Sequence, residues 1–196
     1  MAGSAKRQAE LETLFFEGPE AFEAWLEAHG EASNEIWVRM AKKGTGIVSL
    51  DWARAVEVAL CFGWIDGQNK RLDDCWFLQR FTPRRPASIW SKVNRQKVEV
   101  LTDAGRMRPA GLAEVARAKA DGRWEAAYDG MATASVPDDL ARALDQAGLA
   151  EAFAALDGRN RYAILHRVQT AKRPQTRADR IARYVAMLAA GERPHP

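Results

Sequence analysis

Residues 61–67 read CFGWIDG, and this stretch decides how the first half of the chain is built. Residues 50–62 carry apolar side chains at helical spacing, so we expect a helix that ends at Gly63, where glycine tolerates a left-handed backbone. The residues after Gly63 change to short apolar runs of the kind that form strands, with a turn at Gly67. A helix that passes into a few short strands is typical of an α+β fold.

The segments on either side of this stretch supply the rest of a small sheet and its helices. Pro19 and Gly30 bracket a predicted helix, because proline is favoured in the first turn and glycine just after the last. The predicted strands follow one another closely, which favours antiparallel pairing. They are expected at residues 35–42, 64–66, 69–72 and 76–81. The first part of the chain therefore predicts a small antiparallel sheet flanked by helices.

From Ser88 onward the sequence pattern is helical. Ser88 is the expected N-cap of the first of these helices, since serine accepts hydrogen bonds from free N–H groups. Thr176, with Asp179 three residues later, is typical of a capping box at the start of the last helix. We therefore predict an α+β domain at residues 1–133 and an all-helical module at residues 134–196.

Composition excludes several classes of protein. The 196 residues are 47% hydrophobic and 28% charged, as in ordinary globular proteins. No apolar stretch reaches the roughly 18 residues of a membrane span, and the polar first residues lack the pattern of a signal peptide. Cys61 and Cys75 are too few for a disulfide scaffold, and no His/Cys spacing predicts a zinc site. We therefore expect a cytoplasmic protein with no metal and no cofactor.

Asp66 is the first candidate functional residue, because the glycines around it restrict the direction of its carboxylate. One interpretation makes Asp66 an acid/base or a ligand-binding group, with Asp73 or Asp74 as a partner carboxylate. The other makes it a turn residue that accepts hydrogen bonds from nearby backbone N–H groups. Aspartate takes the second role readily, so catalysis by Asp66 is the weaker hypothesis.

The segment QRFTPRRPASIWS at residues 79–91 is the strongest candidate for a binding surface. Its two prolines keep it extended, and no acidic residue occurs before Val98. Guanidinium groups, hydroxyls and a helix N-terminus each favour phosphate or carboxylate groups. The alternative is that Arg84 and Arg85 pair with Asp73, Asp74 or Glu57 and brace the sheet. The predicted ligand-binding residues here are Arg80, Thr82, Arg84, Arg85, Ser88, Trp90 and Ser91.

Two further features would complete such a cleft. Trp64 would supply an apolar wall beside the arginines. Lys42 and Lys43 precede Gly44 and could form a basic lip over the cleft, although a solvated loop is the favoured interpretation.

A second basic region lies near the C-terminus, where residues 159–183 contain eight basic residues and one acidic residue, Asp179. Such a helical surface could bind nucleic acid through phosphate contacts. However, the sequence contains neither the interleaved aromatic residues of an RNA-binding sheet nor a helix of a known DNA-reading motif. We therefore favour a small anionic ligand or an acidic partner over nucleic acid.

Several short motifs together resemble the YdeI/OmpD-associated family, also described as bacteriocin-protection proteins. They are FGWIDG at 62–67, RFTPR at 80–84, SIWSKVN at 88–94, AK at 171–172, TR at 176–177 and RI at 180–181. The resemblance covers residues 15–192 and implies a link to stress or bacteriocin protection. It implies no set of catalytic residues.

The function expected from these observations is non-enzymatic binding of a small anionic ligand or acidic partner. No nucleophile elbow, metalloprotease motif or dinucleotide-binding motif occurs in the chain. The two alternatives are an enzyme that uses Asp66 as acid or base, and nucleic-acid association through the C-terminal basic helices. The sequence makes no prediction about the oligomeric state.

Overall fold

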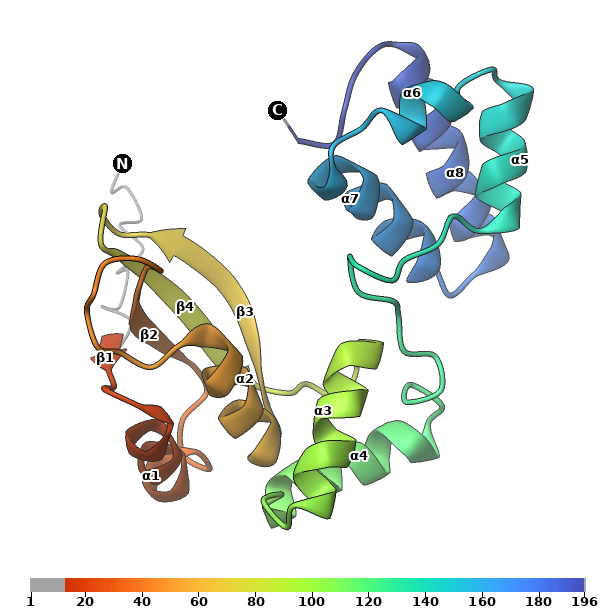
Figure 1. Cartoon of the computed structure of the whole chain (residues 1–196). Helices are drawn as coiled ribbons and strands as arrows, with labels where there is room; N and C mark the ends of the chain where they lie inside the picture. Colours follow the sequence, from red (N-terminus) through yellow and green to blue (C-terminus); the bar gives the residue numbers. More distant parts are fainter. Residues whose placement is uncertain (1–12, 196) are drawn as a thin grey trace, which may run out of the picture. The chain divides into compact units, whose positions relative to one another are not determined.

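The computed structural model describes residues 13–195, so the polar N-terminal residues discussed above lie outside it. It confirms the α+β class and divides into two compact units (Figure 1). Among the described residues, the first unit contains the chain up to Ser88 together with Asn94–Glu125. The second contains Ile89–Val93 and the chain from Ala126 onward.

The first unit is built on a four-stranded sheet with the order β1-β2-β4-β3. The pairs β2–β4 and β3–β4 are antiparallel, as predicted, but β1 runs parallel to β2, so the sheet is mixed. Strand β1 has three residues, too few for an alternating pattern to reveal it. The strands are β1 (Thr13–Phe15), β2 (Ile36–Ala41), β3 (Trp64–Arg71) and β4 (Trp76–Pro83).

The sequence predicted a turn at Gly67 between two strands, and this prediction was wrong. Gly67 lies inside β3, which runs as one strand with a register shift between Asp66 and Asn69. The buried side chain of Gln79 on β4 donates to the carbonyls of Gly67 and Gln68, at 2.9 and 3.3 Å. These bonds satisfy backbone groups that the bulge removes from the ladder, so the strand continues through it.

One face of the sheet packs against α1 (Pro19–His29) and α2 (Trp52–Cys61) (Figure 1). The ring of Phe22 on α1 lies 5.4 Å from that of Phe81 on β4. Trp25 on the same helix meets Trp64 edge to face at 6.2 Å. These aromatic contacts make this face of the sheet the apolar core of the first unit.

Two further helices follow the sheet, α3 (Lys92–Asp103) and α4 (Pro109–Ala120). Helix α3 begins four residues after Ser88, so the prediction of Ser88 as its N-cap was wrong. Helix α4 crosses the end of α2 closely, and the backbone N–H of Arg108 donates to the carbonyl of Cys61 at 3.0 Å. Gly63 has the predicted left-handed backbone, with φ of +74°.

The second unit is helical, as predicted, and buries its own apolar core. Its helices are α5 (Asp138–Gln146), α6 (Ala150–Ala154), α7 (Gly158–Gln169) and α8 (Pro174–Ala189). Thr176 lies inside α8 and not at its N-cap, so the predicted capping box was also wrong. None of the helices in the described part of the chain is long and apolar enough to cross a membrane. The core residues are Leu140, Leu144, Phe153, Ile164, Leu165, Val168, Ile181, Tyr184 and Leu188.

Candidate functional site

A cavity of about 500 Å³ lies in the first unit, where the ends of α1, α2 and β4 meet the beginnings of β3 and α4. We call it the Arg84 pocket. Its walls combine aromatic, apolar and charged side chains. They include Phe62, Trp64, Pro83, Arg84, Arg108 and Glu114.

The CFGWIDG stretch holds the pocket together. The carbonyl of Gly63 accepts a hydrogen bond from the backbone N–H of Arg84 at 2.9 Å, which fixes the end of β4 beside the end of α2. A Cβ at Gly63 would lie 2.9 Å from Cγ of Glu114 and 3.0 Å from the carbonyl oxygen of Ala110. Glycine is therefore required here both for the left-handed backbone and for the close approach of α4.

Arg84 is the most deeply buried charge among the pocket residues, with 5% of its surface exposed. Arg108 is more exposed and pairs with Glu23 at 3.0 Å and Glu27 at 3.3 Å. Its guanidinium carbon also lies 5.7 Å from the ring centroid of Phe62. Of these two arginines, Arg84 is therefore the more shielded from water.

Asp66 lies next to this pocket in β3. One of its carboxylate oxygens accepts a hydrogen bond from Nε1 of Trp52 on α2, at 3.1 Å. Burial raises the pKa of Asp66, while the bond from Trp52 and the positive charge of Arg84 lower it. The partner that holds Asp66 across the fold is thus a tryptophan side chain, which the turn interpretation did not include.

The structure does not bring Asp66 together with Asp73 or Asp74. Those residues lie in the hairpin between β3 and β4, at the other end of β3. Asp73 Oδ1 accepts from the backbone N–H groups of Cys75 and Trp76, both at 2.8 Å, and Asp74 pairs with Arg71. The paired-carboxylate arrangement is therefore absent from the described fold.

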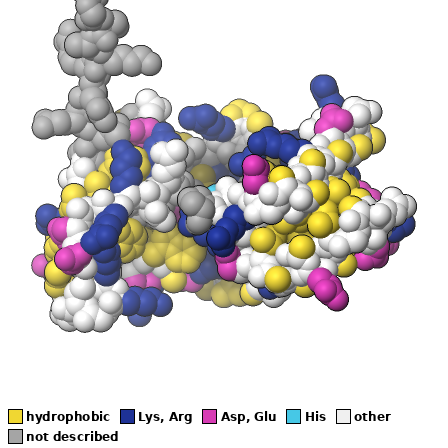
Figure 2. All heavy atoms as spheres, turned by 90° about the horizontal axis from the view of Figure 1, so that it is seen from above, with side chains coloured by type: hydrophobic (Ala, Val, Ile, Leu, Met, Phe, Trp, Pro, Cys, Tyr) yellow, Lys and Arg dark blue, Asp and Glu magenta, His cyan; other side chains and the backbone are white. Residues whose placement is uncertain are grey.

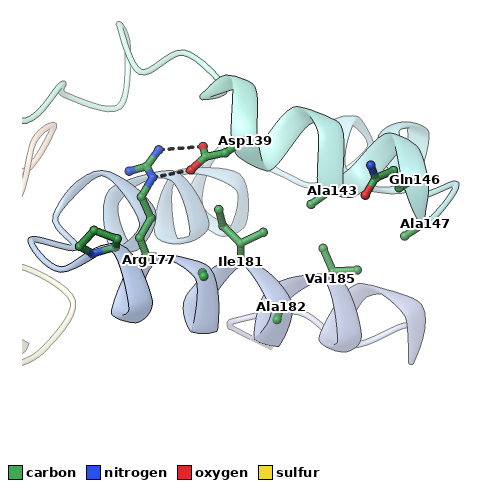
Figure 3. Close-up of a pocket in the computed structure, with 10 residues that line it drawn as sticks. Asp139, Ala143, Gln146, Ala147, Arg177, Ile181, Ala182 and Val185 are labelled. Atoms are coloured by element: carbon green, nitrogen blue, oxygen red, sulfur yellow. Dashed lines mark hydrogen bonds and ion pairs between the residues drawn. The ribbon is translucent and has the colours of Figure 1, made fainter.

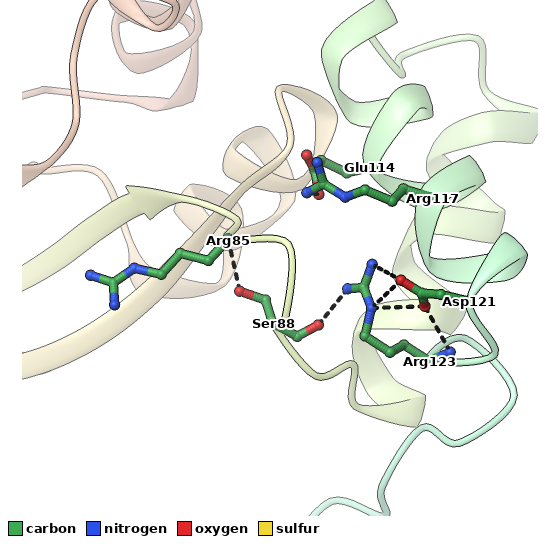
Figure 4. A network of polar contacts seen from close by, with 6 residues as sticks. All are labelled: Arg85, Ser88, Glu114, Arg117, Asp121 and Arg123. Atoms are coloured by element: carbon green, nitrogen blue, oxygen red, sulfur yellow. Dashed lines mark hydrogen bonds and ion pairs between the residues drawn. The ribbon is translucent and has the colours of Figure 1, made fainter.

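Arg85 does not line the Arg84 pocket, and its exposed side chain extends away from Ser88 (Figure 4). The backbone N–H of Arg85 donates to Oγ of Ser88 at 2.9 Å, which closes a turn. Arg123 holds this turn by donating to the carbonyl of Ser88 at 2.7 Å, and it pairs with Asp121 at 2.8 Å. Sequence reasoning missed Arg123, since nothing local indicates a contact with a residue 35 positions away.

Other predicted binding residues lie in different parts of the fold. Arg80 pairs with Glu35, with Nε at 3.1 Å from the carboxylate, a contact that the sequence did not predict. Thr82 pairs with Ile65 within the sheet. A separate group, Trp90 and Ser91, belongs to the second unit, where both pair with the backbone of Tyr128.

Lys42 and Lys43 are also separated from Arg84. Residue Ala41 pairs with Trp76 at the start of β4, whereas Arg84 follows the end of the same strand. Eight extended residues span about 25 Å, so the lysines lie at the opposite end of the sheet. Nζ of Lys42 donates to the carbonyl of Asp73 at 2.6 Å, which anchors the loop to the hairpin.

The C-terminal arginines partly serve to join helices. Arg177 on α8 pairs with Asp139 on α5 through two contacts, at 2.6 and 2.9 Å, and closes one end of an apolar cavity of about 600 Å³ (Figure 3). Arg180 donates to the carbonyl of Arg167. On the face that Figure 2 shows, Lys and Arg side chains lie among acidic and hydrophobic ones, and do not form one continuous basic area.

Comparison with known families assigns the two parts of the chain separately. A model described as "Domain of unknown function (DUF8412)" matches residues 14–114. A second, described as "Bacteriocin-protection, YdeI or OmpD-Associated", matches residues 133–191 and confirms the resemblance in the helical part. No curated protein and no solved structure matches the chain.

Proposed function

This chain belongs to the family with a DUF8412 domain and carries a bacteriocin-protection, YdeI or OmpD-associated module at residues 133–191. We propose that it binds a small anionic ligand in the Arg84 pocket. The observation that carries this proposal is the burial of Arg84 in a cavity with aromatic walls. A guanidinium group binds carboxylate or phosphate through two parallel hydrogen bonds, and such bonds are stronger away from water.

The other walls support a ligand with an apolar body. Phe62 and Trp64 provide aromatic surface, and the N-terminus of α4 at Pro109 adds a partial positive charge. The cavity volume of about 500 Å³ is in the range of pockets that enclose metabolites.

The acidic residues of the pocket limit the ligand's charge and size. Glu27, Glu31 and Glu114 all contribute to its lining. They would repel a large polyanion or an acidic protein surface. A small molecule with one anionic group, directed at Arg84, avoids this repulsion. We therefore prefer a small ligand over the acidic partner that the sequence left open.

A thermal-shift screen of small carboxylates and phosphate monoesters tests the proposal, because a compound that binds only the folded state raises the melting temperature. The wild type and Arg85→Met should be stabilised by the same compound, whereas Arg84→Met should not. Arg85 is the matched control, since its side chain is exposed and points away from Ser88. If Arg84→Met does not fold, Arg84→Lys keeps the charge but loses the paired geometry and should bind more weakly.

Two results would overturn the proposal. One is a screen in which no compound stabilises the wild type. The other is a stabilising compound whose effect survives in Arg84→Met, because that ligand would bind elsewhere.

A further inference from the structure

The face of the sheet opposite α1 and α2 carries aromatic and basic side chains from all four strands. The register of the strands places them together, since Phe15 pairs with Arg39, and Trp37 pairs with Arg80. We call this surface the outer sheet face. Its aromatic and basic residues are Phe15, Trp37, Arg39, Lys70, Trp76 and Arg80.

At one side of the outer sheet face, two rings and a guanidinium group form a stack. Phe15 and Trp76 meet edge to face, with ring centroids 5.8 Å apart. The guanidinium carbon of Arg39 lies 5.3 Å from the Phe15 centroid and 4.8 Å from the Trp76 centroid. Phe15 is 39% exposed, Arg39 is exposed, and Trp76 is half-buried. Planar groups are therefore available to solvent here.

In the middle of the face, Nζ of Lys70 lies 4.3 Å from the ring centroid of Trp37. Lys70 is exposed and covers a tryptophan that is itself 3% exposed. Within residues 13–195, neither Arg39 nor Lys70 forms an ion pair with an acidic side chain. Glu35, the acidic residue at this face, pairs with Arg80. The outer sheet face therefore has an excess of positive charge.

These observations together fit one class of partner. An open sheet with exposed rings and unneutralised cations is the arrangement with which proteins bind single strands, because bases stack on the rings while cations contact phosphates. We propose that the outer sheet face binds single-stranded nucleic acid with little sequence preference. Phe15 and Trp76 stack on bases, and Arg39 and Lys70 contact the phosphates.

This proposal differs from the nucleic-acid alternative drawn from sequence, which relied on the C-terminal arginines. The aromatic residues went unnoticed there because Phe15 and Trp76 are 61 positions apart in the chain. The parallel pairing of β1 with β2, followed by β4, brings them into contact.

Fluorescence anisotropy with a labelled oligo-dT of about twelve nucleotides at low salt tests the proposal, because phosphate contacts are strongest there. The combined Phe15→Ala and Trp76→Ala variant should bind about tenfold more weakly or worse. Arg39→Ala should lower the slope of log K against log salt by about 0.7, the value for one phosphate contact on a single strand. If the double variant melts at a lower temperature, Phe15→Ala alone tests the same stack at an exposed position.

The controls separate stacking from general attraction to charge. An abasic oligonucleotide of equal length has the phosphates without the bases and should bind more weakly than oligo-dT. The matched variant Lys172→Ala with Arg173→Ala removes two exposed charges from the helical unit and should leave binding unchanged. The proposal is wrong if oligo-dT does not bind at low salt, if the abasic strand binds equally well, or if only the Lys172 and Arg173 variant loses binding.

Discussion

Gly111 on α4 should reverse the usual effect of replacing a helical glycine. In an unconstrained helix, Gly→Ala stabilises by about 1 kcal/mol, since alanine loses less conformational freedom. In this fold the added Cβ would lie 2.2 Å from the carbonyl oxygen of Cys61 and 2.8 Å from that of Leu60. Both neighbours are backbone atoms at the end of α2, so no change of side-chain rotamer relieves the contact.

The size of the effect follows from these distances. Overpacking costs about 1–3 kcal/mol, and a contact with rigid backbone belongs at the upper end of that range. After subtraction of the helical gain, Gly111→Ala should lower the free energy of unfolding by about 2 kcal/mol. Because Pro109 and Ala110 line the Arg84 pocket, the same variant should also lower the affinity of any compound that binds there.

Urea unfolding followed by tryptophan fluorescence measures this loss as a lower midpoint at an unchanged slope. Gly158→Ala at the start of α7 is the matched control, since no atom outside the neighbouring backbone of its own helix lies within 4 Å of its added Cβ. Gly158→Ala should be neutral or stabilising. A Gly111→Ala variant as stable as the wild type would refute the close crossing of α4 over α2, and with it the shape of the Arg84 pocket.

Three other predictions concern titratable or charged side chains that are buried or half-buried. Burial raises the pKa of Asp66 in the folded state, so the fold favours the protonated carboxyl. The folded state therefore loses stability as pH rises from the ordinary pKa of 3.8 through the raised one. Asp66→Asn, which is neutral and can still accept from Trp52, should therefore raise the melting temperature at pH 7; a lower value would contradict this reasoning. Burial, aided by the charges of Arg167 and Arg180, lowers the pKa of His166. The fold therefore favours the neutral imidazole, and the stability that this adds is present above the ordinary pKa of 6.5 and is lost as pH falls through the lowered pKa. His166→Gln should flatten the fall in melting temperature on acidification, and an equally steep fall would mean that another group is responsible. Arg123→Met should lower the free energy of unfolding in urea by about 2 kcal/mol or more, because its charged hydrogen bond to the carbonyl of Ser88 is lost. A change as small as that of Arg85→Met would show that the turn holds without it.

The sequence predicted those parts of the fold that depend on nearby residues. Helical spacing and proline or glycine punctuation located α1, and alternation located β2, because each signal repeats several times within one element. Strand β1 and the bulge at Gly67 were missed for the opposite reason. A three-residue strand repeats nothing, and the bulge depends on Gln79, twelve positions away from Gly67.

The candidate site was predicted only in part. The structure places Arg84 and Trp64 in one pocket, where the sequence analysis had put Trp64 as a wall beside the arginines. Arg85, adjacent in sequence, points elsewhere, since neighbouring residues of an extended chain project to opposite sides. Lys42 was assigned to the same cleft, but strand register places it at the far end of the sheet. Register and ion pairing between distant residues decide such questions, and a single sequence does not encode them visibly.

The hydrogen bonds made by the carbonyl groups at the end of α2 couple the segments around the Arg84 pocket. A helix end normally leaves such groups to water, and it frays easily. Here the carbonyl of Cys61, the last residue of α2, accepts from the backbone N–H of Arg108, which precedes α4. The carbonyl of Gly63, two residues past the helix, accepts from that of Arg84, which follows β4. Unwinding of the chain from the end of α2 through Gly63 must release both segments at once. The amide protons of Arg84 and Arg108 should therefore exchange with solvent at similar rates, because both are released by the same local opening.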